Sequence, residues 1–395
     1  MSGRPTTTRW AAAWLIGLLV VGLLADFLAN DRPLVASVNG ELRFPVAHEY
    51  GRGLGLTDPY VPVVRNWRRT ETDWALWPPV PYAAGASDLR NANYKSPFAE
   101  QDTGERARHY LGTDKLGRDV LAGLIAGARV ALFVGLGSVL ISLVLGVPLG
   151  AVAGYFGNDR LRNTRAHWWG HAVGGILGAV YALVSLAPFF GWSSWLGSGL
   201  LAVGGFFVVG SLTARLLALV PALRRPAALP ADALVLQAVE LFVNIPGLVL
   251  LIALMAVIDR PSLTVVVVVI GVLRWPTVAR YLRGELLRVR SLPYLDAARI
   301  GGIGEWRVLF RHALPNAWGP LLVVISFGFG SAVLLEAALS FLGIGIPADR
   351  VTWGSLLRQS RTQPGAWWLA VFPGLLLTVT VLAANALRAL GRLRL

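Results

Sequence analysis

The sequence predicts an all-α integral membrane protein with about eight transmembrane helices and one long external segment. Of its 395 residues, 55% are hydrophobic and 15% are charged, which is far from the composition of a soluble domain. Apolar runs of about 20 residues, the length that crosses a ~30 Å hydrocarbon layer, recur along most of the chain. The charged residues are distributed unequally between the segments that join these runs.

Eight apolar runs are long enough to be spans, at 10–29, 130–155, 168–190, 196–222, 234–258, 262–282, 318–343 and 367–390. They divide the chain into an N-terminal tail with the first span (1–29), an external segment (30–119), a second span region (120–157), an inserted transmembrane hairpin (158–232) and a core (233–395) with a polar loop at 294–316.

The charge distribution fixes the expected orientation. If the N-terminus is cytoplasmic, the short inside segments hold 17 arginines against five acidic residues, whereas residues 31–119 hold 12 basic and 12 acidic side chains. This is the positive-inside pattern of a membrane protein, so the net charge of +14 indicates no nucleic-acid partner. We expect a multi-pass protein of the inner membrane, in contact with lipid, with both termini in the cytoplasm.

The first span and the external segment each allow two interpretations. Arg4 and Arg9 precede the first apolar run as in a secretory signal, but its length of about 20 residues favours a retained anchor. The external segment could be a flexible tether, but its aromatic residues favour a small packed structure. Alternating residues around Asn39-Gly40 predict a β-hairpin within it.

Glycines repeat every four residues on two of the expected helices, at 146, 150 and 154 and at 170, 174 and 178. Such faces let two helices approach closely in lipid, so we expect them at helix interfaces.

No catalytic constellation is present, so an enzyme is not expected and no cofactor is implied. The chain has no cysteine, no phosphate-binding loop and no nucleophile elbow. His167 and His171, at i and i+4, could share a metal ion, but interfacial side chains at a helix start are the favoured interpretation. Glu240 and Glu336 lie inside expected spans, either on a translocation path or paired between helices.

The polar loop at 294–316 carries the strongest functional signal. We expect one short helix from Tyr294 to Ile300, a break at Gly301-Gly302, and a second helix from Ile303 that ends at Pro315. Apolar residues spaced i, i+3, i+4 and i+7 form one stripe on the second helix, namely Trp306, Leu309, Phe310 and Ala313. An amphipathic helix on the inside face either lies on the lipid surface or docks onto a partner.

The stretch DAARIGGIGEWRVLFRHALP resembles the EAA motif of the permease subunits of ABC importers. Further stretches, LGTDKLGRDVLAGLIAGAR, AGYFG, LLEAALSFLGIGIP and WGSLL, are similar to the dipeptide and oligopeptide branch of that family, and ANDRPL is similar, more weakly, to its Yej-type subgroup. The chain departs from the motif at Asp296, which replaces a glutamate, and at His312, which replaces an isoleucine. The hairpin at 158–232 is additional to the usual six-span subunit.

The resemblance implies a type I permease fold and a non-catalytic subunit that works with a second permease, two cytoplasmic ATP-binding subunits and an external solute-binding protein. The residues it implies for coupling to the ATPase are Tyr294, Asp296, Ala297, Ala298, Gly301, Gly302, Trp306, Phe310, Arg311, His312, Leu314 and Pro315. The expected solutes are short peptides. The alternatives are a nickel chelate or a sugar carried by the same machinery, an ion-coupled secondary transporter, and a membrane scaffold or sensor.

Overall fold

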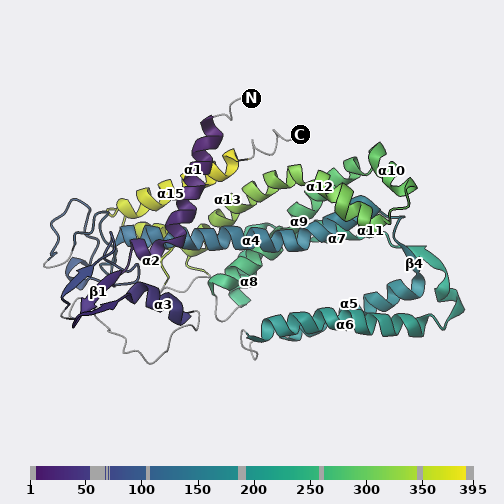
Figure 1. Cartoon of the computed structure of the whole chain (residues 1–395), viewed down its shortest axis with the longest axis horizontal. Coiled ribbons are helices and arrows are strands. Elements are labelled where there is room, and N and C mark those ends of the chain that lie inside the picture. Colours follow the sequence, from purple (N-terminus) through teal and green to yellow (C-terminus); the bar gives the residue numbers. More distant parts are fainter. Residues whose placement is uncertain are drawn as a thin grey trace. The chain divides into compact units, whose positions relative to one another are not determined.

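The computed structural model describes residues 6–53, 67, 70, 72–103, 107–185, 193–257, 262–344 and 350–387 (Figure 1). The chain is mostly helical and separates into two compact units. The large unit contains Met1–Pro148, Leu241–Leu282 and Pro315–Leu395, and the small unit contains Leu149–Glu240 and Arg283–Leu314.

Four described helices are long and apolar enough to cross a membrane, namely α4 (Val120–Phe156), α9 (Leu263–Val289), α13 (Trp318–Leu342) and α15 (Trp368–Ala386). A fifth candidate is the pair α7 (Ala231–Val243) and α8 (Gly247–Val257), which is bent by 79° at the break between them. Pro246 immediately precedes α8, and proline cannot donate the backbone hydrogen bond that a continuous helix needs. Among the described residues there are therefore four or five candidate spans.

The other expected spans appear as shorter apolar segments or extend beyond the described residues. The first helix, α1 (Thr6–Leu23), ends where the chain turns at Leu24 into the short α2 (Ala25–Leu28), and its apolar part covers Thr7–Leu23. The expected hairpin corresponds to α5 (Arg165–Ser185) and α6 (Ser193–Leu217), of which Gly204–Leu217 is a short apolar segment. Residues 186–192, which connect α5 and α6 in the sequence, lie outside the described residues.

The core of the large unit contains two buried tryptophans, Trp353 at the start of α14 (Trp353–Thr362) and Trp368 at the start of α15. The indole N–H of Trp353 donates to the carbonyl of Leu124 on α4 at 2.9 Å, and that of Trp368 donates to the carbonyl of Thr113 at 3.1 Å. Each ring is thus buried with its one polar atom satisfied, which lets it fill the core without a desolvation penalty.

The described residues of the segment at 30–119 contain the expected hairpin. Strands β1 (Val35–Val38) and β2 (Glu41–Arg43) pair antiparallel through Asn39 and Gly40, both at positive φ, and β3 (Trp74–Leu76) completes a sheet of order β2-β1-β3. Asp73 ties the hairpin turn to β3 by accepting hydrogen bonds from the Ser37 hydroxyl at 2.8 Å and the Gly40 N–H at 3.1 Å. The helix α3 (Pro45–Gly53) follows β2.

A buried polar cluster fixes the turn that leads into α4. His109 is fully buried, with its ring nitrogens 2.8 Å from Asp119 and 3.5 Å from Asp88, and its ring stacks on Tyr82. Asp88 immediately precedes the 3₁₀ turn η2 (Leu89–Asn91). A Cβ on Gly117 would lie 2.0 Å from the Asp88 carbonyl oxygen, so the turn closes only around glycine.

The small unit contains α5 and α6 packed side by side as a helical hairpin (Figure 1). At the base of this hairpin, β4 (Arg162–Thr164) pairs with β5 (Pro226–Ala228), which follows the 3₁₀ turn η3 (Pro221–Arg224). Asp232 at the start of α7 forms a two-point ion pair with Arg283 of α9.

Both glycine faces lie at helix interfaces, as expected from their spacing. A Cβ on Gly146 of α4 would lie 2.8 Å from the carbonyl oxygen of Trp275 on α9, and one on Gly154 would lie 2.7 Å from that of Arg283. On α5, a Cβ on Gly174 would lie 2.7 Å from backbone atoms of Phe206 and Gly210. These contacts join α4 to α9 and α5 to α6.

The α5–α6 contact yields a test of stability. In Gly174→Leu a side chain meets backbone that cannot give way, so we expect a loss of about 1–3 kcal/mol and a lower thermal unfolding midpoint in detergent. Gly204→Leu is the matched control, because no atom lies within 4 Å of a Cβ on Gly204. Equal stability of the two variants would contradict the close packing of α5 against α6.

Candidate functional site

The polar loop between α9 and α13 folds into two short helical pieces joined by a glycine turn. The first piece is α10 (Pro293–Ile300), and Gly302 at φ +77° follows it. The second piece begins at Glu305 and consists of α11 (Glu305–Val308), a π-helical turn η4 (Leu309–Ala313) and α12 (Leu314–Asn316). The second helix therefore starts two residues later than expected, and it continues through Pro315 to Asn316 rather than ending at the proline.

Burial divides the expected apolar stripe into two parts. Leu309 and Ala313 are fully buried, together with Leu295 and Val308, whereas Trp306 and Phe310 are 52% and 60% exposed. The π-helical turn shifts the side chains that follow it relative to an α-helical repeat, which i, i+3, i+4 spacing assumes. The stripe is thus half core and half surface, and the expectation that it is one docking face was wrong for Leu309 and Ala313.

None of the 12 residues expected to couple to the ATPase is buried. Nine are exposed, namely Tyr294, Asp296, Ala297, Gly301, Gly302, Trp306, Phe310, Arg311 and Pro315, and three are half-buried, namely Ala298, His312 and Leu314. The loop therefore presents these residues outward while a separate set of apolar side chains anchors it.

Arg299 holds the two pieces of the loop together. Its guanidinium lies 2.6 Å from an Asp296 oxygen and 3.4 Å from a Glu305 oxygen, and it donates to the Tyr155 hydroxyl at 3.3 Å. The Tyr155 hydroxyl in turn donates to Glu305 at 2.5 Å. Because Tyr155 belongs to the end of α4, this cluster fixes α10 and α11 to each other and to α4.

The interactions around Arg299 contribute unequally to the stability of the loop. Its side chain is only 18% exposed, but the Asp296 side chain is 63% exposed, so that pair contributes little, about 0–1 kcal/mol. Hydrogen bonds to charged groups contribute about 1.5–3 kcal/mol, which makes the Tyr155–Glu305 bond the stronger tie. Burial opposes the charge on Arg299, but Tyr155, Asp296 and Glu305 together raise its pKa, so the guanidinium stays protonated.

Two aromatic rings stand on the surface next to this cluster. The Trp306 ring packs on Phe156 of α4 at a centroid distance of 4.7 Å and stacks with the Phe310 ring at 6.0 Å, with 18° between the planes. The exposed Arg307 and Arg311 lie on the same helical piece. We call Trp306, Phe310, Arg307 and Arg311 the exposed coupling face.

The two acidic residues expected inside spans occupy different environments. Glu336 on α13 is buried and accepts a hydrogen bond from the Ser340 hydroxyl at 2.7 Å. Glu240 on α7 is exposed. The Glu336–Ser340 contact lies within α13. The two alternatives for Glu240 and Glu336, a translocation path or pairing between helices, stay predictions.

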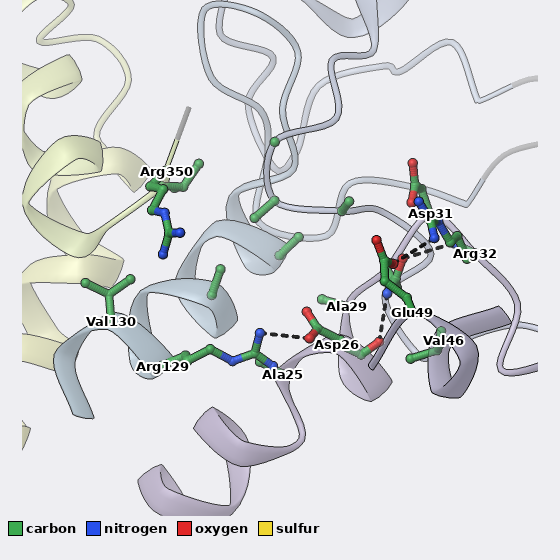
Figure 2. A pocket seen from close by; sticks show the side chains of 17 residues that line it. Ala25, Asp26, Ala29, Asp31, Arg32, Val46, Glu49, Arg129, Val130 and Arg350 are labelled. Atoms are coloured by element: carbon green, nitrogen blue, oxygen red, sulfur yellow. Dashed lines mark hydrogen bonds and ion pairs between the residues drawn. The ribbon is translucent and has the colours of Figure 1, made fainter. Parts of the chain in front are cut away.

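Two further candidates lie elsewhere. The rings of His167 and His171 are 4.2 Å apart, and no cluster of three or more metal-binding side chains occurs among the residues described. A cavity of about 630 Å³ in the large unit is lined by two ion pairs, Asp26 with Arg129 at 2.8 Å and Arg32 with Glu49 at 2.7 Å. Figure 2 shows both pairs, with Arg350 apart from them on another wall.

Sequence reasoning missed the roles of Tyr155, Arg299 and Glu305. Tyr155 lies within AGYFG, a stretch that resembles the importer permeases, but nothing in the spacing of one tyrosine indicates a contact with a loop 150 residues away. Arg299 and Glu305 flank the glycine turn with opposite charges, and that pattern was the available signal.

The Tyr155 hydroxyl provides a test of how the loop is held. In Tyr155→Phe the ring remains but the bond to Glu305 is lost, so we expect faster hydrogen exchange of the backbone amides of α10 and α11 by several-fold. Tyr281→Phe is the control, because Tyr281 is an exposed tyrosine on α9. Unchanged exchange in Tyr155→Phe would show that the buried apolar residues alone position the loop.

Comparison with known proteins places this site in a family. Residues 216–391 match the family described as binding-protein-dependent transport system inner membrane component. The chain is 26% identical over 385 residues to a peptidoglycan transport system permease protein, YejE, of Agrobacterium fabrum, which covers 92% of this chain and 82% of the relative.

Two more relatives have related names. The di/tripeptide transport system permease protein DppC of Pseudomonas aeruginosa is 29% identical over 71% of this chain and 70% of its own length. The glutathione transport system permease protein GsiD of Pectobacterium atrosepticum is 27% identical over 72% of this chain and 71% of its own length. The matched region contains the loop, and the apolar helices around it have the length of membrane spans. The chain belongs to the inner membrane components of binding-protein-dependent transport systems, and it is the multi-pass, non-catalytic permease of an ABC importer that works with ATPase and solute-binding partners.

Proposed function

We propose that the chain carries short peptides into the cell as one of two permease subunits, with two ATP-binding subunits in the cytoplasm and one external solute-binding protein. The observation that carries the coupling role is the exposed coupling face, two stacked aromatic rings with adjacent arginines on a loop held by Arg299. The relatives named for peptidoglycan, di/tripeptide and glutathione transport support peptides as the solute class.

The proposed topology places both termini and the loop at 294–316 in the cytoplasm and residues 30–119 outside. It retains eight spans, a six-span core plus the hairpin at 158–232, with the remaining boundaries at 29, 119 and 157. Arginines at 299, 307 and 311 near the ends of α9 and α13 support the inside position of the loop.

The chemistry of the exposed coupling face defines the surface that would receive it. Because Asp296 and Glu305 pair with Arg299, the net positive charge of the loop is carried by Arg307 and Arg311. An aromatic pair next to two cations fits an apolar groove with acidic residues at its rim. Trp306 is held between Phe156 and Phe310 before any partner binds, which lowers the entropy cost of docking.

The chain path explains how docking would reach the spans. Three residues separate the end of α9 at Val289 from the start of α10, and Ala317 alone separates α12 from α13. Closure of the ATP-binding subunits would therefore move α9 and α13 as rigid bodies through very short connections, and ATP would favour one access state by binding it more tightly.

The exposed coupling face is tested by truncating its rings. We expect Trp306→Ala and Phe310→Ala each to cost about 2 kcal/mol or more of affinity for the ATP-binding subunits, measured by co-purification, with loss of ATP-dependent uptake. Phe98→Ala is the control, because it removes an even more exposed ring from the external segment, and this variant should bind normally. Normal co-purification of both loop variants would refute docking through this face.

The solute class is tested in reconstituted vesicles that contain the full transporter, with ATP enclosed and the solute-binding protein and solute added outside. We expect ATP-dependent uptake of a labelled tripeptide that excess unlabelled tripeptide suppresses and that a nickel chelate or a sugar leaves unchanged. Uptake that follows an ion gradient and persists without the ATP-binding subunits would identify a secondary transporter instead. A chain without any solute-dependent activity would be a scaffold or sensor.

A further inference from the structure

A second cavity of the large unit, of about 450 Å³, lies between α14, the C-terminal end of α13 and the turn that leads into α4. Its volume lies in the range of sites that hold small molecules. We call it the basic cavity, because five of its lining side chains are cations, namely Lys115, Arg118, Arg350, Arg358 and Arg361.

Among the described residues that line the basic cavity, five cations stand against one acidic residue, Asp114. Asp114 already accepts hydrogen bonds from the backbone N–H groups of Leu116 and Arg118 at 2.8 and 2.9 Å and from the Gln359 amide at 3.2 Å. Arg118 Nε is buried and has no hydrogen-bond partner among the described residues. A buried donor without a partner is destabilising, and a bound acceptor would remove that cost.

The frame that holds these cations is built from several fixed contacts. Thr352 and Ser355 cap α14 reciprocally, with hydrogen bonds of 2.9 and 3.1 Å, and the Gln359–Asp114 bond ties α14 to the turn. Gly343 at φ +80° leaves room for Arg358, because a Cβ there would lie 2.7 Å from the guanidinium. Arg361 lies over the Phe341 ring at 5.8 Å.

The charges that line the cavity of Figure 2 are balanced differently from those of the basic cavity. In the cavity of Figure 2, Asp26 pairs with Arg129 and Glu49 pairs with Arg32, so most of its charge is neutralised within the wall. Arg350 lines both cavities, but only the basic cavity collects cations with a single, engaged carboxylate. An excess of fixed positive charge in a partly enclosed space attracts anions.

We propose that the basic cavity is a binding site for an oxyanion, a carboxylate or phosphate group, which Arg118, Arg358 and Arg361 grip and Lys115 attracts. Planar guanidinium groups match the two oxygens of a carboxylate, and three of the lining cations are the guanidinium groups of Arg118, Arg358 and Arg361. The ligand is either a solute carboxylate or an anionic lipid headgroup. The external position of the site rests on the proposed topology, because the cavity lies at the end of α13 remote from the coupling loop.

Lysine labelling tests the site directly, because the chain has only two lysines, Lys95 and Lys115. Lys115 lines the cavity, and Lys95 is an internal reference. The assembled transporter in phosphatidylcholine nanodiscs, without ATP, is treated with an amine-reactive reagent, and the labelling rate of each lysine is read by mass spectrometry. The probes are tri-glutamate, tri-glutamine amide as an uncharged match, and inorganic phosphate, and a second arm replaces part of the lipid by phosphatidylglycerol.

We expect tri-glutamate to slow labelling of Lys115 several-fold and saturably while Lys95 is unchanged, and tri-glutamine amide to have no effect. Protection should disappear in Arg358→Gln/Arg361→Gln and persist in Arg43→Gln/Arg90→Gln, a pair of exposed arginines outside the cavity. Protection by phosphatidylglycerol alone would support the same site with lipid as the source of the oxyanion.

Two outcomes would overturn the site. One is equal protection by tri-glutamate and its uncharged match, and the other is protection that survives Arg358→Gln/Arg361→Gln. Unchanged Lys95 labelling and normal recovery of the variant transporter show that the variant is folded. Because labelling is read on the permease without ATP, failure of the coupling proposal would leave this result unaffected.

Discussion

The position of Arg299 is the constraint on which the conformation of the loop at 294–316 depends. One guanidinium meets the carboxylate before the glycine turn, the carboxylate after it and the hydroxyl at the end of α4. Without this convergence, α10 and α11 would be two short helices joined by a flexible glycine pair, and helices of this length are not stable alone. With it, the loop becomes a preformed surface whose anchors, Leu295, Val308, Leu309 and Ala313, are separate from the side chains it displays.

At the C-terminal end of α13, too, one set of residues is buried in the core and a different set faces a cavity. Trp353 and Trp368 fill the core and satisfy their indole N–H groups on backbone carbonyls, and the Asp114–Gln359 bond fixes the turn against α14. The arginines of the basic cavity then project from a rigid frame. Glycine contacts hold α4 close to α9, at Gly146 in the large unit and at Gly154 in the small unit.

Much of the architecture could be predicted from the sequence, because spanning a membrane requires apolar runs of a set length and close helix contacts require regularly spaced small residues. Apolar length indicated the spans around α4, α9, α13 and α15, and four-residue glycine spacing predicted close contacts at Gly146 and Gly174. The Asn39-Gly40 turn was predictable because few other dipeptides adopt two positive φ angles. The number of spans was less predictable, since apolar runs do not show that Pro246 bends one of them or that α1 ends at Leu23.

The position of the loop at 294–316 could be predicted from the sequence, but which of its apolar residues are buried and which are exposed could not. Helical spacing assumes 3.6 residues per turn, so it could not anticipate the π-helical turn at Leu309–Ala313 that separates buried Leu309 from exposed Phe310. The contact of Tyr155 with Glu305 and the gathering of Lys115 with Arg358 depend on packing between distant segments, which no local pattern encodes.

The most direct measurement is photo-crosslinking from the coupling loop in the assembled transporter. A photoreactive amino acid at position 306 should form its main adduct with an ATP-binding subunit, whereas the same group at position 308, which is fully buried in the permease, should form none with that subunit. An adduct from position 306 to lipid, or equal adducts from both positions, would show that this face does not dock onto the ATPase.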